Sequence, residues 1–338
     1  MNKKEMARSL WDMSFGDNVQ FTDLYFKKRY TDENTVAIYD GEQMISVLQL
    51  LPYPLLWNNT ELDSGYISGA CTHLEYRNKG AMHQLLKDSL NKLAKENTPI
   101  CTLIPAEEWL FDYYAKSGFE TIFYNAHYNL ELTELEINPE IIVSSTTDFT
   151  KKLYTYLDKK NRERNTVILH TTQDMEVVTT DLKESGGILF IARNKRNIVG
   201  LAFAYFDTDS ETVVLYELVS ENCSIKQEIS KAAAKYFNTT KVRIIAPPYH
   251  IEGKPFGMLR IVLAIPLLKI FAKANPKFTD KFLLKDAIIA ENSGTYSINN
   301  GVVDFSKENI DTDKTISINE LAQLLFGESN AYMSLMLD

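Results

Sequence analysis

The sequence predicts an α/β protein made of two similar α/β units followed by a smaller α+β unit. Two observations carry this prediction: the order hairpin, strand, helix occurs twice along the chain, and the hydrophobic texture changes near Pro255. The chain has 338 residues, enough for two or three domains of about 150 residues each. Its composition, 45% hydrophobic and 24% charged, is typical of globular proteins and excludes collagen-like or disordered chains.

The first unit begins with a β-hairpin over residues 36–51. β-branched and aromatic residues flank the turn pair Asp40-Gly41, which favours a hairpin. A strand is expected over residues 66–72. A helix is expected from Gly80, because apolar residues then recur at intervals of three and four: Met82, Leu85, Leu86, Leu90 and Leu93.

The second unit repeats this order. A hairpin is expected from residues 188–192 and 198–203, then a strand over 213–218 and a helix over 225–236. We interpret the two units as a degenerate internal duplication. The second strand-to-helix junction, residues 219–224, has no glycine and contains Glu221. A phosphate site is therefore expected in the first unit alone.

The third unit begins near Pro255. An apolar, helix-like run extends to residue 274, and strands are expected over 282–290 and 294–305. The last helix is well defined, because Ser317 and Glu320 form a capping box and Gly327 follows the apolar stripe. The tail, residues 331–338, is apolar enough to dock on the protein.

The charge balance bears on partners. The 36 basic and 45 acidic residues give a net charge of −9, which offers no general attraction for nucleic acid or anionic membranes and weakly favours cationic small molecules.

The three cysteines lie far apart, which favours a cytoplasmic protein. Acidic residues near the N-terminus exclude a signal peptide, and the most apolar run, residues 261–268, is too short to span a membrane.

One short segment has the outline of an anion site. Arg77, Lys79 and Gly80 lie between a predicted strand and a predicted helix N-terminus. The free N–H groups of a first helical turn and the helix dipole favour an anion there, and a glycine permits close approach. A pyrophosphate fits this description better than a single carboxylate. The alternative is a glycine turn with solvated basic residues.

Two motifs resemble those of the GNAT acetyltransferase superfamily. Arg77-x-x-Gly80-x-Met82 resembles its acyl-coenzyme A signature, Q/R-x-x-G-x-G/A, with Met82 departing at the last position as in the Eis-type branch. Tyr114 lies four residues before Gly118-Phe119, as does the tyrosine of the second GNAT hallmark. The alternative for Tyr114 is a helical aromatic that faces the core.

The order of the three units is similar to the Eis layout. That resemblance implies two tandem GNAT folds, each a mixed central sheet flanked by helices, and a sterol-carrier-like α+β domain. The expected boundaries are 1–128 for the catalytic GNAT domain, 129–255 for the degenerate copy, and 256–338 for the third domain with its tail. It also implies a homo-oligomer, a hexamer in relatives of this type.

The resemblance implies acetyl-coenzyme A as cosubstrate and a primary amine as acceptor: an aminoglycoside-like compound, a polyamine or a lysine side chain. Backbone groups of Ala70, Cys71 and Thr72 are expected to hold the pantetheine arm. The pyrophosphate is expected at residues 77–82, that is Arg77, Asn78, Lys79, Gly80, Ala81 and Met82.

Transfer also needs an acid and a base. Tyr114 is expected to protonate the thiolate of coenzyme A. The resemblance implies that the C-terminal residue supplies the base, here Asp338, although relatives more often end in an aromatic residue. Glu107 and Glu108, just before the Tyr114 helix, are rival bases.

Other functions are weighed against this one. Cys71 suggests an acyl-cysteine intermediate, which direct transfer does not need. The five histidines show no metal-ligand spacing, and no metal is expected. A lipid-binding protein that uses the GNAT copies as scaffold, and a coenzyme-binding module without turnover, are the alternatives to an enzyme.

Overall fold

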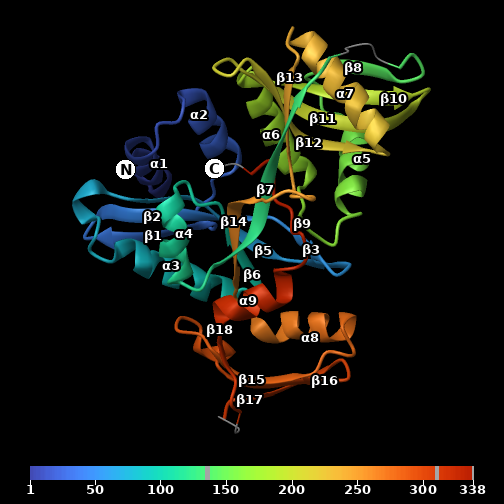
Figure 1. Ribbon diagram of the computed structural model, residues 1–338. Helices are drawn as coiled ribbons and strands as arrows, with labels where there is room; N and C mark the ends of the chain where they lie inside the picture. Colours follow the sequence, from blue (N-terminus) through green and yellow to red (C-terminus); the bar gives the residue numbers. More distant parts are fainter. Residues whose placement is uncertain (134–137, 309–311, 337–338) are drawn as a thin grey trace. The chain divides into compact units, whose positions relative to one another are not determined.

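The computed structural model describes residues 1–133, 138–308 and 312–336 (Figure 1). The chain forms two compact units. The first combines residues 1–123 with 255–331, and the second combines 124–254 with the described tail residues 332–336. Both units are mixed α/β, which confirms the predicted fold class. The predicted domain boundaries at residues 128 and 255 stay predictions.

The first unit opens with two helices and a mixed sheet. Its elements in chain order are α1 (Lys3–Ser14), α2 (Val19–Lys28), β1 (Thr35–Asp40), β2 (Gln43–Pro52), β3 (Leu55–Trp57), β4 (Thr60–Leu62), β5 (Ser64–Thr72), the 3-10 turn η1 (Leu74–Tyr76), α3 (Ala81–Lys95), β6 (Ile100–Leu103) and α4 (Glu108–Ala115). The main sheet has the order β1-β2-β5-β6-β14, where β14 is Lys254–Ile261. The expected hairpin, strand and helix are all confirmed.

Helices cover both faces of this sheet because its strands are apolar on both sides. Leu48 and Leu50 of β2 pack with Leu85 and Leu86 of α3 in one core cluster. The alternate residue Gln49 faces the other way and contacts Tyr25 of α2. Figure 1 shows α1 and α2 on one side of β1 and β2, and α3 on the other.

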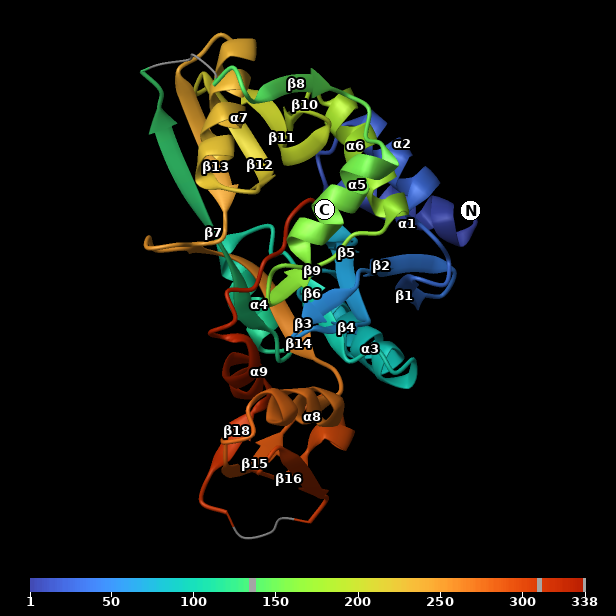
Figure 2. The same ribbon diagram turned by 90° about the vertical axis from the view of Figure 1, so that its right-hand side faces the viewer.

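The second unit repeats the pattern. After β7 (Glu120–Glu131), which begins in the first unit, come β8 (Ile142–Thr146), α5 (Lys151–Asn161), β9 (Thr166–Ile168), α6 (Thr172–Glu184), β10 (Ile188–Asn194), β11 (Asn197–Asp207), β12 (Thr212–Ser220), α7 (Cys223–Tyr236) and β13 (Lys241–Ala246). Its sheet has the order β7-β13-β12-β11-β10-β8. Figure 2 shows α7 on one face of β10 to β12 and α5 with α6 on the other. The second hairpin, strand and helix are confirmed.

The C-terminal part of the first unit differs from expectation at its start. Residues 254–261 form the strand β14 rather than a helix, because β6 has a free edge with which Met258 to Ile261 pair antiparallel. The apolar helix α8 (Ala264–Ala274) follows. The predicted strand over 282–290 is β15 (Asp280–Lys285), which ends where Asp286 turns into a buried polar network.

A small sheet completes this part, in the order β17-β16-β15-β18. It is formed by β15 with β16 (Gly294–Asn299), β17 (Val302–Ser306) and β18 (Thr315–Ser317), and the 3-10 turn η2 (Ala290–Asn292) precedes β16. The last helix, α9 (Ile318–Phe326), has the expected capping box, but Gly327 at its end is right-handed, with φ −57°.

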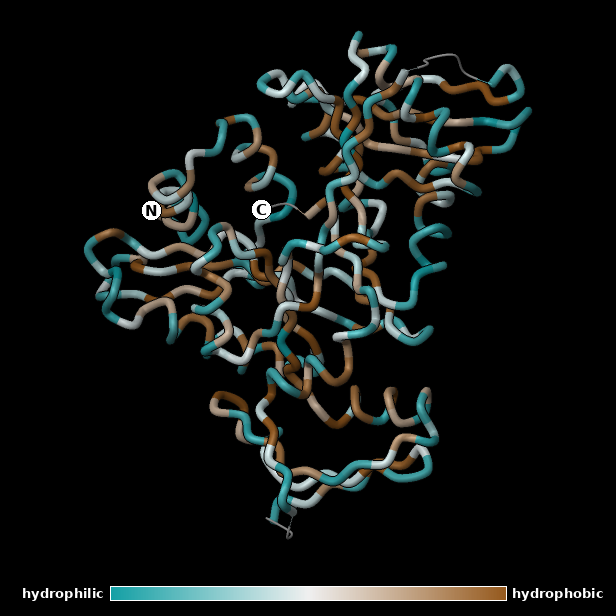
Figure 3. Tube along the Cα trace, viewed as in Figure 1, coloured by the Kyte–Doolittle hydropathy of each residue, from teal (hydrophilic) through white to brown (hydrophobic). Residues whose placement is uncertain are grey.

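Burial follows the sequence pattern in both units. Figure 3 shows hydrophobic stretches along the strands and helices and hydrophilic turns between them. No helix in the described part of the chain is both long and apolar enough to cross a lipid bilayer.

Candidate functional site

The first feature of the site is the edge of β5 that faces β6. β5 and β6 pair in parallel only from Ser64 to Tyr66. β5 continues to Thr72, so its last six residues have no paired strand on the β6 side among the described residues. Unpaired backbone N–H and C=O groups of a strand bind an extended ligand that carries amides of its own. Ala70, Cys71 and Thr72, predicted to hold a pantetheine arm, lie on this stretch.

A β-bulge shapes the same stretch. Gly69 and Ala70 lie opposite a single residue of β2, between the pairs Gln49↔Ser68 and Val47↔Cys71. Gly69 has φ +60°, and a Cβ added to it would lie 2.1 Å from a ring carbon of Trp11. Only glycine fits both the conformation and the space. The Trp11 ring of α1 therefore packs directly on the backbone of the bulge.

A buried hydrogen-bond network supports the bulge from the α2 side. The Tyr25 hydroxyl lies 2.9 Å from Oγ of Ser68 and 3.2 Å from Oε1 of Gln49. All three side chains are buried. A satisfied polar network in an apolar core fixes its members in one arrangement.

The N-terminus of α3 supplies free N–H groups beside the end of β5. Gly80 is its N-cap, with φ +86° and no side-chain cap. The first intrahelical bond runs from Gln84 N to Gly80 O, at 3.0 Å, so the N–H groups of Ala81, Met82 and His83 have no intrahelical acceptor. A Cβ on Gly80 would meet nothing within 4 Å, which leaves the space in front of the helix open.

The loop before α3 presents two cations. Arg77 and Lys79 are both exposed. Nε of Arg77 donates to the carbonyl of Thr72 at 3.2 Å, which holds the guanidinium beside the end of β5. Nζ of Lys79 lies 5.4 Å from the centroid of the Tyr76 ring. Asn78 between them is left-handed, with φ +60°. This arrangement is suited to a phosphate group.

Tyr114 lies in the apolar cluster that fills the space next to β5 and β6. The cluster contains Ile67 of β5 and Leu103 of β6, with Ala70 and Met82 at its margin. Burial raises the pKa of Tyr114 to about 12, and the neighbouring Tyr113 adds to the shift. The phenol is therefore protonated at neutral pH and can act only as a proton donor.

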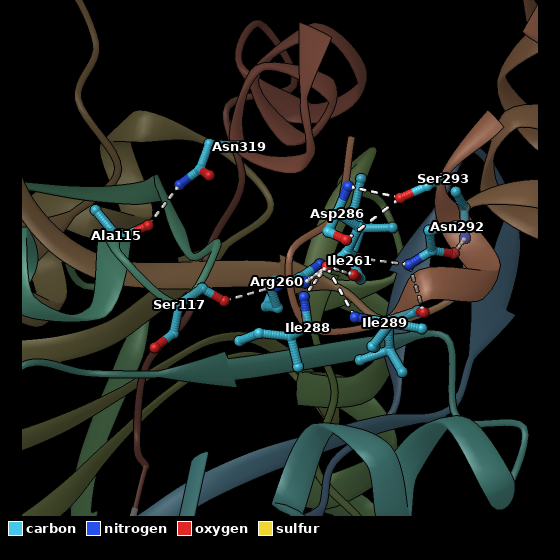
Figure 4. A network of polar contacts seen from close by, with 12 residues as sticks. Ala115, Ser117, Arg260, Ile261, Asp286, Ile288, Ile289, Asn292, Ser293 and Asn319 are labelled. Atoms are coloured by element: carbon cyan, nitrogen blue, oxygen red, sulfur yellow. Dashed lines mark hydrogen bonds and ion pairs between the residues drawn. The ribbon is translucent and has the colours of Figure 1, made fainter. Parts of the chain in front are cut away.

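A buried polar network fixes the end of the Tyr114 helix (Figure 4). Nε of Arg260 donates to the carbonyl of Ser117 at 2.9 Å, and Nη2 contacts Oδ1 of Asp286 at 2.7 Å. Nδ2 of Asn319 donates to the carbonyl of Ala115 at 3.1 Å. Gly118 is left-handed, with φ +87°, and a Cβ there would lie 2.4 Å from Arg260.

Asp286 is the buried counter-ion of this network. Burial by itself would raise its pKa, but the Arg260 guanidinium and hydrogen bonds from Asn292 and from the Ile289 N–H more than offset it, so the pKa of Asp286 is lowered. Both charged side chains are almost fully buried, at 1% and 0% exposed. The C-terminal part of the unit thereby holds the end of α4 in place.

Several other candidate residues lie in surroundings that do not favour a catalytic role. Burial raises the pKa of the Cys71 thiol to about 12, although Ser14 and Arg77 lower it, so the thiol is not an activated nucleophile. Glu107 and Glu108 are exposed. Nδ1 of His73 accepts from the Glu75 N–H at 3.3 Å and so caps the 3-10 turn. Asp338 lies outside the described residues.

The structure thus gathers Ala70, Met82 and Tyr114 around one cluster. Gly69 and Trp11 are not predicted by the sequence patterns above, although a glycine inside a strand pattern is a recognised signal of a bulge. Arg260 and Asp286 are not predicted either, because no local sequence signal marks them.

The N-terminal part of the chain matches a known family of domains. Residues 2–122 match the family model described as "Acetyltransferase (GNAT) domain". A search of curated proteins found no match.

Several solved structures share the fold along nearly the whole chain. A GCN5-related N-acetyltransferase from Anabaena variabilis is 18% identical with a TM-score of 0.75, covering 95% of this chain and 86% of that one. A protein of unknown function from Enterococcus faecalis, described as a probable N-acyltransferase, is 16% identical with a TM-score of 0.76, covering 96% and 88%. Eis1 from Mycobacterium abscessus is 9% identical with a TM-score of 0.73, covering 96% and 87%.

At these identities the structures establish the fold, and the family model establishes the domain. The prediction of a GNAT acetyltransferase enzyme is confirmed at that level. Residues 2–122 of this chain therefore match a GNAT acetyltransferase domain, and domains of this superfamily use acetyl-coenzyme A.

Proposed function

We propose that this protein is an Eis-type N-acetyltransferase that moves an acetyl group directly from acetyl-coenzyme A to a primary amine. One observation carries the proposal: the unpaired edge of β5, ending at Thr72, adjoins an uncapped helix N-terminus behind Gly80 within a GNAT domain. The edge suits the amides of pantetheine, and the helix N-terminus suits the pyrophosphate.

In this proposal each part of the coenzyme has its own partner. The N–H groups of Ala81 and Met82, with Arg77 and Lys79, bind the pyrophosphate. The backbone of Ala70 to Thr72 binds the pantetheine arm as an added strand and polarises the thioester carbonyl. Met82 departs from the coenzyme motif only in its side chain. Its backbone N–H still binds the phosphate, because that group does not depend on the side chain.

The transfer itself forms a C–N bond and breaks a C–S bond. The neutral amine attacks the thioester carbonyl carbon, and the electron pair of the C–S bond leaves with sulfur. Tyr114 gives its proton to the thiolate, and the amine proton passes to a carboxylate. We assign that carboxylate to Asp338, at the chain end. The same apolar surroundings also raise the pKa of the coenzyme A thiol. The thiolate therefore takes up a proton more readily.

The acceptor class follows from the chemistry of transfer and from charge. GNAT acetyltransferases act on small-molecule or peptide amines. The net charge of −9 supports an acceptor that carries further positive charge, such as a polyamine, an aminoglycoside-like compound or a lysine side chain. A sterol-carrier-like third domain and a hexamer belong to the same Eis-type proposal, which the shared fold with Eis1 supports.

The test is calorimetric titration of acetyl-coenzyme A into the purified wild type and Gly80→Glu. A glutamate at Gly80 puts a carboxylate in front of the α3 N-terminus, where it competes with the pyrophosphate. The matched control is Gly186→Glu, since Gly186 also has a positive φ, +76°, with nothing within 4 Å of its Cβ position. We expect micromolar binding to the wild type and the control, and none to Gly80→Glu.

Two results would contradict the proposal. If the wild type binds no acetyl-coenzyme A, the acetyltransferase assignment fails. If Gly80→Glu binds as well as the control does, the pyrophosphate is not held at α3. Binding that follows expectation justifies a screen of amines by thiol release.

A further inference from the structure

The two GNAT-like copies carry the same β-bulge at the same place. In the first copy, Gly69 and Ala70 lie opposite one residue of β2. In the second, Glu217 and Leu218 of β12 lie opposite one residue of β11. The first bulge residue is left-handed in both copies, with φ +60° at Gly69 and +46° at Glu217. Glu217 is therefore the structural counterpart of the glycine at the proposed acyl site.

A glutamate is an unfavourable residue for this position. The left-handed conformation strains any side chain with a Cβ. Glu217 is also only 3% exposed, and burial raises its pKa, against the opposing effect of Arg164 and of hydrogen bonds from Tyr332 and Asn161. A strained, buried, ionisable residue persists where the surroundings require it.

The partners of Glu217 come from the C-terminal tail of the chain. Oγ of Ser334 donates to Oε1 of Glu217. The Tyr332 side chain acts on the same carboxyl group and lowers its pKa. Both tail side chains are buried, at 8% and 3% exposed. The Arg164 guanidinium lies 4.2 Å from the centroid of the Tyr332 ring.

The tail backbone is held as well. Tyr332 pairs in parallel with Val167 of β9: its N–H donates to the carbonyl of Thr166 at 3.0 Å, and its carbonyl accepts from the Ile168 N–H at 3.0 Å. Nε2 of His170 lies 3.2 Å from the carbonyl oxygen of Leu335. Figure 2 shows the tail running past β9.

The strand opening of the second copy is also present. β12 pairs with β13 in parallel only from Val213 to Leu215, and β12 continues to Ser220. The second copy thus keeps the strand separation and the bulge that the first copy uses in the proposed coenzyme site. Its bulge carries a carboxylate in contact with the chain's own tail.

We propose that Glu217 is the centre of a tail clamp, formed with Arg164, Tyr332 and Ser334, through which the degenerate GNAT copy binds the C-terminal segment. The clamp makes Glu217 a positioning residue for acetyl transfer. This role in transfer rests on the proposed function, in which Asp338 supplies the base. Asp338 is three residues beyond Leu335 in the sequence, so a clamp on the tail restricts the space that the chain end can reach.

Holding the tail removes the entropy cost of bringing its end to the reaction at each turnover. A loose tail reaches the same place only part of the time. Loss of the clamp is therefore expected to lower kcat while leaving the affinity for acetyl-coenzyme A unchanged.

The test variant is Glu217→Gly in the full-length protein. Glycine suits the left-handed bulge, as it does at Gly69, so the backbone is retained while the carboxylate is lost. The matched control is Glu211→Gly, which makes the same change at an exposed glutamate with φ +50°. Ser334→Ala removes the contact from the tail side, and Glu217→Gln keeps an oxygen that accepts from Ser334.

Hydrogen exchange of the Ile168 and Tyr332 amides measures docking independently of activity. We expect their protection to fall at least about tenfold in Glu217→Gly and Ser334→Ala, and to be retained in Glu211→Gly and Glu217→Gln. With saturating acetyl-coenzyme A, kcat should fall about tenfold or more in the first two variants, because a positioned base contributes at least that much.

The outcomes separate the two proposals. Retained amide protection in Glu217→Gly overturns the clamp. Lost protection with unchanged kcat supports the clamp as the site that docks the tail, and overturns both its role in transfer and the assignment of Asp338 as base. If the wild type transfers no acetyl group, the proposed function fails, and the exchange measurement still decides the clamp.

Discussion

At the scale of single residues, Tyr114 is the proposed proton donor. It lies in an apolar cluster, and burial raises its pKa to about 12, so the phenol stays protonated across the range in which the amine acceptor becomes neutral. No described residue accepts a hydrogen bond from its hydroxyl. In the proposed function, this protonated hydroxyl is the group that protonates the leaving thiolate.

Tyr114→Phe is expected to lower kcat about 100-fold, the usual contribution of a positioned proton donor, with no change in the Kd of acetyl-coenzyme A. The control is Tyr113→Phe, a partly buried neighbour on the same helix. The protonated phenol is the active form, and its pKa is raised. Deprotonation of Tyr114 should therefore not lower the kcat of the wild type up to about pH 10. Steady-state kinetics with thiol detection measures both effects, and a kcat equal to that of the control would remove Tyr114 from the mechanism.

Gly69 is the residue on which the geometry of β5 depends. Gly69→Ala is expected to lower the free energy of unfolding by about 2–4 kcal/mol, because it adds left-handed strain and forces the methyl group against Trp11. Gly41→Ala is the control, because Gly41 has a similar φ, +57°, and open space around its Cβ position. Its free energy of unfolding should fall only by the cost of left-handed strain, about 1–2 kcal/mol. Urea denaturation compares the two, and equal losses would mean that the Trp11 contact is unimportant.

At the scale of elements, the end of α4 is fixed by strands and helices from the other end of the chain. Arg260 of β14 bonds the carbonyl of Ser117, and Asn319 of α9 bonds those of Ala115 and Phe119. Helix ends leave carbonyl groups without intrahelical partners, and here side chains satisfy them. The helix that carries Tyr114 is therefore held by the third part of the sequence.

Asp286→Asn should destabilise the protein by about 3–5 kcal/mol near neutral pH, because Arg260 then loses its buried counter-charge. The pKa of Asp286 is lower in the folded protein than in the unfolded chain, where it is about 3.9. The contribution of Asp286 to the free energy of unfolding is therefore present above about pH 3.9, and it is lost as the pH falls through the folded pKa. The difference in unfolding free energy between wild type and variant should therefore shrink below about pH 4.

Denaturant titrations at several pH values test this. Asp304→Asn, at an exposed position of β17, serves as the control and should change stability by no more than about 0.5 kcal/mol. A difference between wild type and Asp286→Asn that stays constant with pH would show that the ion pair does not stabilise the fold.

At the scale of the whole molecule, the two units repeat one order of elements but differ at the bulge and at the helix N-terminus. The first has a glycine at its bulge and an open helix N-terminus, and the second has Glu217 at its bulge and Asn222 as the side-chain cap of α7. One acetyl-coenzyme A per chain is therefore expected. A stoichiometry of two in the calorimetric titration would contradict the loss of the second site.

Deletion of Asp338 is expected to lower kcat about 100-fold with the Kd of acetyl-coenzyme A unchanged, because the proposed base is removed. Asp338→Asn keeps the main-chain carboxylate and removes that of the side chain. If the main-chain group is the base, Asp338→Asn retains its activity, and if the side chain is the base, both variants lose it. Activity retained in both would exclude the chain end from the reaction.

The sequence by itself determined the features that depend on neighbours along the chain. The turn at Gly80, the apolar stripe of α3 and the capping box at Ser317 are set by backbone conformation and helical periodicity within a few residues. The proposed coenzyme motif and Tyr114 could be predicted for the same reason, because each lies in a short segment at a helix end.

Only the tertiary structure decided the contacts between distant segments. β14 is a strand because the edge of β6, more than 150 residues earlier, offers it hydrogen bonds, whereas its apolar sequence also suited a helix. The contacts of Gly69 with Trp11, of Arg260 with Ser117 and Asp286, and of Glu217 with Ser334 are of the same kind. The strain and burial at these residues are offset by partners that local sequence does not reveal, and they arise only when the chain has folded.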